Sequence, residues 1–262
     1  MSGIRFVTVL ALAAALVSGC AAKTATLPPG TADADKFLFD RGTEAAKDRK
    51  WLNAREYFRN LVDNYPQSPY RPDAKLALGD TYIGEHTTES QLLGANEFRE
   101  FLTFYPTHQR ADYAQLQLAR SFTEQMLAPE RDQSATRDAI KEIEIFLQRF
   151  PNSALMPEAR KLERQARDRL SEAGYRVGFF YFRLKYYPGA IDRFQEVLKT
   201  DPAFTNRDAV YYHLAESLYR TEKKAEALPY YERLLREFEK SEFLEVTQKR
   251  VAELKGGSPA GK

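Results

Sequence analysis

The chain has 262 residues, of which 39 are lysine or arginine and 37 are aspartate or glutamate, so its formal net charge is only +2. This near balance argues against a nucleic-acid-binding protein, which would carry a marked basic excess. The single cysteine, Cys20, excludes an intramolecular disulfide, so packing must stabilise the fold.

The first twenty residues have the pattern of a secretion signal. Arg5 supplies a positive charge, and the apolar run 6–17 is too short to cross a membrane as a helix. The run leads into Val-Ser-Gly-Cys at 17–20, which resembles a bacterial lipobox, in which the cysteine is acylated and becomes the new N-terminus. The alternative is an ordinary signal peptide with an incidental cysteine. We predict a signal peptide over 1–19 and a lipidated, palmitate-type anchor at Cys20; Ala21 in place of Asp favours the inner leaflet of the outer membrane.

Both ends of the mature chain have little apolar content. Residues 20–33 include Pro28, Pro29 and Gly30 among small residues, and this composition is typical of a flexible tether. Residues 256–262 have a similar composition, which predicts a disordered tail.

The sequence between these ends repeats itself. Four segments end in a proline, and a fifth has glutamate in its place: Pro66, Pro106, Pro151, Pro202 and Glu239. The residues eight positions before these are Phe58, Phe98, Ile143, Phe194 and Tyr231. The residues twelve positions before them are Ala54, Gly94, Ala139, Ala190 and Ala227. This spacing places a small and a large apolar residue on one helical stripe, and the proline ends each helix.

A small residue also precedes several of these stripes by twelve positions, as in Gly42, Gly178 and Ala215. This is the spacing of a tetratricopeptide helix pair, with a small residue in the first helix and an aromatic in the second. We predict an all-α fold: a right-handed superhelical array of about five such pairs, with ten or eleven helices and no sheet. The side chains expected to be buried between helices are Phe58, Phe98, Phe146, Phe194 and Tyr231. The polar residues after the prolines are candidate N-caps of the following helices: Gln67, Ser68, Thr107, Asn152 and Ser153.

One helix of the array is expected to be unusually long. From Pro157 to Leu184, apolar or small residues recur every three or four positions without a break, which predicts a central helix of about 28 residues and roughly 42 Å. We interpret it as the first helix of repeat four and as a strut between two halves of the array. The predicted domains are residues 34–153 with repeats one to three, and residues 154–255 with repeats four and five and a final helix.

The sequence indicates no enzyme. None of the three histidines has a second histidine or cysteine at metal-ligand spacing, and no phosphate loop or nucleophile motif is present, so we expect no catalytic residue, metal or cofactor. The alternating charges around 158–172 are typical of a solvated helix face. The aromatic run from Tyr175 to Tyr187 is interpreted as core between repeats, with a ligand-binding cluster as the alternative.

The chain resembles the BamD/ComL family of outer membrane assembly lipoproteins. The resemblance extends from Cys20 to about Leu254 and is most specific in the segments 105–108, 112–114, 146–153, 178–181 and 189–194. It implies a periplasmic scaffold, anchored in the outer membrane, that binds the POTRA domains of a BamA-like barrel subunit and unfolded outer-membrane proteins. Further assembly lipoproteins are implied as partners, although Glu239 and the short tail depart from the family pattern.

The resemblance also implies that the two halves of the array bind different partners. It implies that repeats one and two receive an extended substrate peptide and that repeats three to five hold the barrel subunit. For the substrate groove we select Arg41, Asp73, Lys75 and Tyr82, and for the contact with the barrel subunit we select Arg193. An internal salt bridge from Arg193 to Asp192 or Glu196 is the alternative for that residue. Other functions stay open: a repeat lipoprotein serving as a secretin pilotin or cell-wall-enzyme adaptor, and a lipid-anchored hydrolase.

Overall fold

The structure is a computed structural model that describes residues 33–256. The signal peptide predicted over 1–19, Cys20 and nearly all of the tether and tail lie outside this range, so those expectations remain predictions. Within it the chain forms eleven helices and no strand, which confirms the all-α prediction. The described residues fall into two compact units, with the division between Gly84 and Glu85. The sequence-based division after residue 153 stays a prediction.

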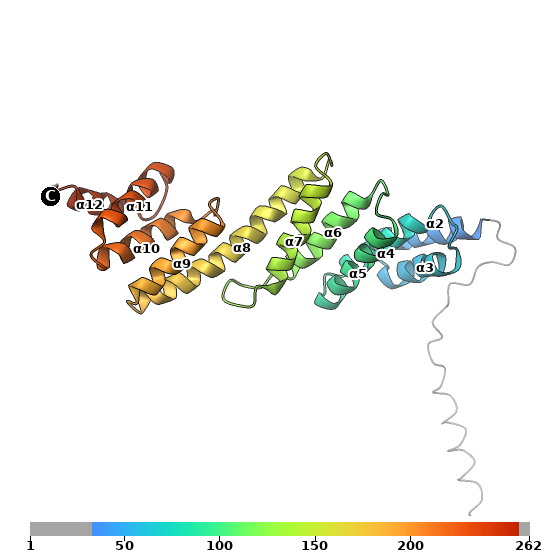
Figure 1. Cartoon of the computed structure of the whole chain (residues 1–262). Helices are drawn as coiled ribbons and strands as arrows, with labels where there is room; N and C mark the ends of the chain where they lie inside the picture. Colours follow the sequence, from blue (N-terminus) through green and yellow to red (C-terminus); the bar gives the residue numbers. More distant parts are fainter. Residues whose placement is uncertain (1–32, 257–262) are drawn as a thin grey trace, which may run out of the picture. The chain divides into compact units, whose positions relative to one another are not determined.

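The first unit holds three helices, labelled as in Figure 1: α2 (Ala34–Lys47), α3 (Trp51–Asn64) and α4 (Arg71–Ile83). Helix α3 packs against both α2 and α4. Its core gathers Leu38 from α2, Phe58 and Leu61 from α3, and Ala74 and Leu78 from α4, all at most 2% exposed.

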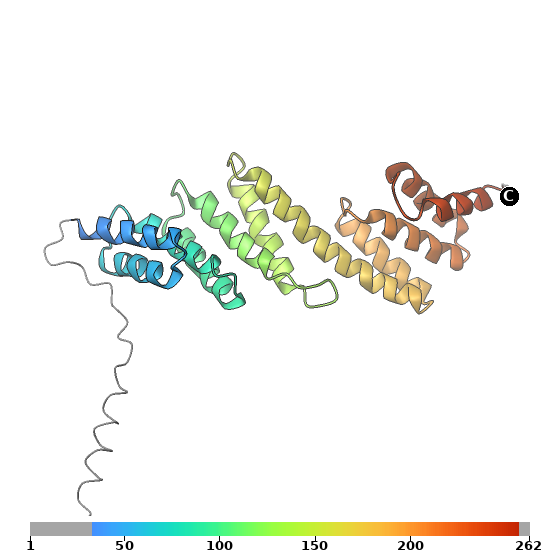
Figure 2. The same ribbon diagram turned by 180° about the vertical axis from the view of Figure 1, so that it is seen from behind.

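The second unit holds eight helices in chain order: α5 (Thr88–Phe104), α6 (Ala111–Glu124), α7 (Ser134–Arg149), α8 (Met156–Arg183), α9 (Tyr187–Thr200), α10 (Arg207–Arg220), α11 (Lys224–Glu237) and α12 (Leu244–Leu254). Each helix packs mainly against the next, as expected for stacked helix pairs. Figure 2 shows α8 running past α7 and on to α9. Its 28 residues match the length predicted from Pro157, which lies in its first turn.

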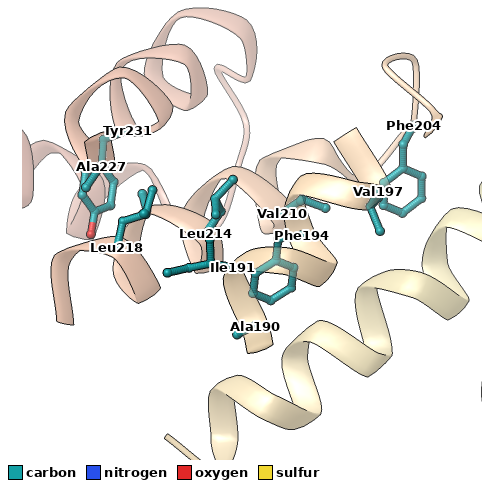
Figure 3. Packing of buried hydrophobic residues seen from close by; sticks show 11 residues of the cluster. Ala190, Ile191, Phe194, Val197, Phe204, Val210, Leu214, Leu218, Ala227 and Tyr231 are labelled. Atoms are coloured by element: carbon teal, nitrogen blue, oxygen red, sulfur yellow. The ribbon is translucent and has the colours of Figure 1, made fainter. Parts of the chain in front are cut away.

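The predicted contact between a small residue and an aromatic is present in both units. A Cβ atom added to Gly42 would lie 2.6 Å from Cε1 of Phe58, and one added to Gly178 would lie 2.6 Å from Cε1 of Phe194. Glycine therefore lets the two helices of each pair approach closely enough for the ring to fill the space between them. All five side chains predicted to be buried are at most 1% exposed, as confirmed for Phe58, Phe98, Phe146, Phe194 and Tyr231. Figure 3 shows Phe194 and Tyr231 within the core cluster of α9, α10 and α11.

The predicted N-caps are wrong for all five candidates: Gln67, Ser68, Thr107, Asn152 and Ser153. The N-cap positions of α4, α6 and α8 are Tyr70, Arg110 and Leu155, and none of them caps its helix through a side chain. Most of these hydroxyls instead tie the turn back to the first helix of the same pair.

This hydrogen bond from a serine hydroxyl in the turn to an aspartate of the first helix, called the tie below, recurs along the chain. Ser153 donates to Asp112 at 2.6 Å, and Ser241 donates to Asp208 at 2.6 Å. In the first unit a hydrogen bond from Ser68 lowers the pKa of Asp35. The aspartate lies in the first turn of its helix each time, where the free N–H groups favour negative charge. Each of these serine hydroxyls also accepts from the backbone N–H of the next N-cap residue, at 3.1 Å from Tyr70, 3.1 Å from Leu155 and 3.2 Å from Phe243. The serine therefore links the preceding pair to the helix that follows without being its N-cap.

Candidate functional site

A groove of about 840 Å³ lies along the middle of α8 in the second unit. Helix α8 has 28 residues, whereas its neighbours α7 and α9 have 16 and 14, so neither neighbour can cover its full length. The groove is lined by α8, by the start of α7 with the loop before it, and by α9. It is thus a direct consequence of the long helix.

The floor of the groove is an apolar stripe on α8. The stripe follows intervals of one or three residues and consists of Leu170, Ala173, Gly174, Val177 and Phe180. Val177 is 43% exposed and Phe180 is 59% exposed. An exposed apolar stripe at the bottom of a concave surface is typical of a protein-binding site.

Charged side chains stand along the rim. Arg176 binds Glu172 at 2.6 Å, and Arg193 on α9 binds Glu196 at 2.8 Å. Both arginines are about half exposed, with 51% and 48% of their side-chain surface accessible. The pair of Arg193 with Glu196 is exposed on both sides and contributes little to stability, so Arg193 is available to another carboxylate.

A buried carboxylate closes one end of the groove. Asp201, only 6% exposed, accepts hydrogen bonds from two guanidinium nitrogens of Arg164 and, at 2.7 Å, from the Ser171 hydroxyl. Burial by itself would raise the pKa of Asp201, but the hydrogen bonds from Arg164 and Ser171 outweigh it and hold that pKa below its usual value. The network ties the middle of α8 to the turn that follows α9.

The structure places Arg193 on the rim of this groove, in an ion pair with Glu196. The internal salt bridge considered as an alternative is therefore present. It is an exposed i,i+3 pair, for which contributions of only a few tenths of a kcal/mol are typical, so it does not preclude a partner.

The four residues selected for a substrate groove lie in the first unit. Arg41 is on α2, exposed and paired with Glu44 at 2.7 Å, whereas Asp73, Lys75 and Tyr82 are on α4. Asp73 and Lys75 are half-buried.

Tyr82 is 5% exposed and belongs to the core of the unit. Its hydroxyl accepts from Arg59, and the Arg55 guanidinium lies 4.6 Å from its ring centre. Any contact that Tyr82 makes with a ligand would therefore pass through these two arginines of α3.

Sequence reasoning missed part of the groove. Of the aromatic run interpreted as core, Tyr175, Phe179, Tyr181 and Phe182 do pack against the core cluster, but Phe180 lies exposed on the groove floor. Arg131 and Arg137 also line the groove and were passed over, because the segment before α7 reads only as a lengthened loop. Helical position could have singled out Phe180, since it lies off the stripe that carries Gly178.

No group of histidine, cysteine or carboxylate side chains within residues 33–256 could hold a metal ion. In the same range, no helix combines the length and apolar character needed to cross a bilayer. Stacked helix pairs with a shallow, charged and apolar groove define a helical-repeat protein whose surface is suited to binding other proteins.

The chain belongs to the YfiO family of outer membrane lipoproteins, whose model matches residues 31–227. This match includes the first unit and the groove of the second. It confirms the family resemblance seen in the sequence.

Relatives with assigned names agree with that membership. The outer membrane protein assembly factor BamD of Caulobacter vibrioides is 28% identical over 209 residues, which are 79% of this chain and 67% of that protein. BamD of Vibrio cholerae is 26% identical over 201 residues, 73% of this chain and 81% of that protein. Among solved structures, the TPR2AB domain of yeast Sti1 in its Hsp90 complex covers 85% of this chain and 83% of its own, with 13% identity and a TM-score of 0.49. Both relatives are named as assembly factors, in line with the expectation of a binding protein.

Proposed function

We propose that this protein is a lipid-anchored scaffold of the machinery that assembles β-barrel proteins in the outer membrane. It faces the periplasm, binds the POTRA domains of a BamA-like barrel subunit and receives unfolded outer-membrane proteins. The observation that carries the proposal is the family match over residues 31–227, together with relatives named as assembly factors. The arrangement of helix pairs supports a scaffold, because such arrays present extended surfaces to other proteins.

The barrel subunit is assigned to the groove on α8. Arg193 stands on its rim with 48% of its side chain exposed, and its planar guanidinium can exchange Glu196 for a partner carboxylate. The apolar floor supplies the area that a stable contact needs, and the exposed charges around it supply specificity.

The substrate is assigned to the first unit. Arg41 and the two arginines that cover Tyr82, Arg55 and Arg59, offer cationic contacts to an extended polypeptide. Asp73 and Lys75 on the same helix as Tyr82 add polar groups of both signs. Unfolded chains of varied sequence would be held by such general contacts rather than by one specific pocket.

Affinity purification from detergent-solubilised membranes tests the proposal. We expect the wild-type chain to recover a β-barrel protein that carries POTRA domains. Recovery of a secretin or a cell-wall enzyme in its place would favour a pilotin or an adaptor, and would contradict the assembly role.

The lipid anchor has its own test. Cys20→Ala removes the only cysteine, so the variant should be uncleaved or soluble and should leave the outer-membrane fraction. Cell fractionation followed by immunoblotting measures this. The same amount of Cys20→Ala and wild-type protein in the outer membrane would rule out acylation at Cys20 as the anchor.

A further inference from the structure

The carboxylates that line the groove are all engaged by groups of this chain. Glu130 pairs with an arginine at 3.5 Å, and Glu196 does so at 2.8 Å. Asp132 accepts from a backbone N–H at 2.9 Å, and Asp201 is held by the Arg164 guanidinium. The negative charge of the groove is therefore already neutralised or bound.

Two cations on the opposite rim are not engaged. Arg131 and Arg137 are both exposed, and neither guanidinium makes a hydrogen bond or an ion pair with any residue in the part of the chain that the structure describes. The hydrogen bonds from Ser134 hold the pKa of Asp132 below its usual value, and the positive charge of Arg137 contributes to this. Asp132 beside them offsets only part of their charge, so this part of the groove lining carries a net positive charge.

The loop that carries Arg131 is held in place by a buried side chain. Gln133, 6% exposed, donates to the carbonyl oxygens of Ala128 at 2.9 Å and of Arg131 at 3.1 Å, while its own oxygen accepts from Thr136 at 2.8 Å. These bonds fix the backbone of Arg131 relative to the first turn of α7, which carries Arg137. The two guanidinium groups therefore start from a preorganised backbone, which lowers the entropic cost of binding through them.

Cations on the rim and an apolar floor together define the chemistry of the occupant. The residues of α8 that line the groove extend from Arg167 to Tyr181, about 21 Å at 1.5 Å per residue. This length accommodates about six residues of an extended chain. Aliphatic or aromatic side chains would cover Val177 and Phe180, and carboxylates would reach the two arginines.

We propose that the groove on α8 binds an acidic segment of a partner protein that also carries apolar side chains, and that Arg131 and Arg137 select it by its carboxylates. The inference deepens the proposed barrel-subunit site and rests on that proposal only for the identity of the partner. Charge-assisted pairs between guanidinium and carboxylate supply the selectivity, and the exposed stripe on α8 supplies the contact area.

The test uses the full lipoprotein in detergent micelles and a fluorescein-labelled peptide of alternating leucine and glutamate. Fluorescence anisotropy should show binding that weakens with added salt. Replacing each glutamate by glutamine should lower the affinity about tenfold or more, and replacing it by lysine should abolish binding. The double variant Arg131→Glu/Arg137→Glu should lose affinity by at least about tenfold as well.

A matched control changes the same number of charges elsewhere in the unit. Arg99 and Arg236 are exposed and do not line the groove, so Arg99→Glu/Arg236→Glu should bind the acidic peptide as the wild type does. Equal binding of the glutamate and lysine peptides, or equal binding by the wild type and Arg131→Glu/Arg137→Glu, would overturn the inference. So would binding to phosphatidylglycerol vesicles that depends on Arg131 and Arg137 while peptide binding does not, because the cations would then serve a lipid headgroup.

The outcomes also separate this inference from the proposed function. If the peptide binds as expected but affinity purification recovers no barrel subunit, the proposed function fails and the chemistry of the groove stands. If the wild type and Arg131→Glu/Arg137→Glu recover the barrel subunit equally, the proposed function stands and the acidic selectivity is wrong.

Discussion

The pair α2/α3 in the first unit and the pair α8/α9 in the second share the same internal contact. In each, a glycine of the first helix lies against a phenylalanine of the second, Gly42 against Phe58 and Gly178 against Phe194. Each pair also carries an exposed arginine bound to a glutamate three residues later, Arg41 to Glu44 at 2.7 Å and Arg193 to Glu196 at 2.8 Å.

The two pairs differ in how the turn after them is tied back. Asp35 lies in the first turn of α2, seven residues before Gly42, and accepts from the Ser68 hydroxyl. Seven residues before Gly178 the chain has Ser171, which donates to Asp201 in the turn. In this bond the helix supplies the hydroxyl and the turn supplies the acid, which is the reverse of the bond between Asp35 and Ser68. A second bond keeps the ordinary order, because Thr205 in the same turn donates to Asp168 of α8 at 2.7 Å.

Helix length explains the reversal. A carboxylate in a first turn is favoured by the free N–H groups there, but the equivalent position in α8 lies in the middle of a 28-residue helix, where no free N–H remains. The negative charge is instead supplied by Asp201 in the turn and is balanced by Arg164, seven residues or about two helical turns before Ser171. The comparison teaches that one long helix creates both the groove and the buried ion pair.

The largest expected effect tests the contact between glycine and phenylalanine that the two pairs share. Phe58→Ala and Phe194→Ala should each cost about 3–5 kcal/mol of unfolding free energy, because each removes a ring that is at most 1% exposed and leaves a cavity. Urea denaturation followed by far-ultraviolet circular dichroism measures it. Phe104→Ala is the control, since that ring is 67% exposed and should cost almost nothing. A cost for Phe194→Ala as small as that of Phe104→Ala would break the equivalence of the two pairs.

A smaller effect tests the bonds of the aspartate, Asp201 or Asp35, that hold the turn in each pair. Asp201→Asn leaves Arg164 without its buried counter-ion, and we expect a loss of about 1–3 kcal/mol, reduced because water can reach Arg164. Asp35→Asn, in the pair with the ordinary tie, should shift the urea midpoint far less. Similar shifts for the two variants would show that the reversal has no energetic consequence.

Protonation of a buried histidine should lower the stability of the α8/α9 pair and leave the α2/α3 pair unchanged. His213 on α10 packs against the aromatic rings of α8, with ring-centre distances of 5.0 Å to both Phe179 and Phe182. Burial lowers the pKa of His213 and prevails over the opposing effects of the Ala209 carbonyl, Glu216 and Glu242. As the pH falls, the unfolded chain therefore binds a proton at His213 at a higher pH than the folded chain does. The stability that neutral His213 provides is complete above about pH 6.5, and it is lost as the pH falls below that value.

Hydrogen exchange measures this dependence helix by helix. On lowering the pH from about 7.5 to about 5.5, protection corrected for the intrinsic exchange rate should fall in α10 and α8 and stay constant in α2 and α3. Residues 33–84 contain no histidine, so the first unit serves as the internal control. In His213→Gln the pH dependence of α10 should vanish; if it persists, another group is responsible.

Much of the fold was predictable because it depends on local periodicity. The stripe of small and apolar residues from Pro157 onward predicts α8 to within one residue, and the spacing of Gly178 and Phe194 predicts their contact. Both features depend on residue spacing. Apolar residues recur every three or four positions within one helix, and the small residues of two paired helices, such as Gly178 and Ala190, are twelve positions apart.

The candidate site was harder to predict because it depends on residues that are distant in sequence. Arg131 and Arg193 line one groove although 62 residues separate them (193 minus 131), and no periodic pattern connects them. Asp201 breaks the aromatic pattern of Tyr65, Tyr105 and Phe150 before the proline, but its partner Arg164 is visible only in three dimensions. The hydroxyls assigned as N-caps illustrate the same limit, since Ser153 bonds to Asp112, 41 residues earlier.

The most direct test of the account compares the two exposed arginines in one binding measurement. Arg41→Glu and Arg193→Glu remove nearly identical pairs, with 50% and 48% of the arginine side chains exposed, so neither should change helicity or melting temperature appreciably. Binding of purified POTRA domains to the full lipoprotein should weaken at least about tenfold in Arg193→Glu and stay unchanged in Arg41→Glu. Unaltered binding in Arg193→Glu, or an equal loss in both variants, would contradict the assignment of the barrel subunit to the groove on α8.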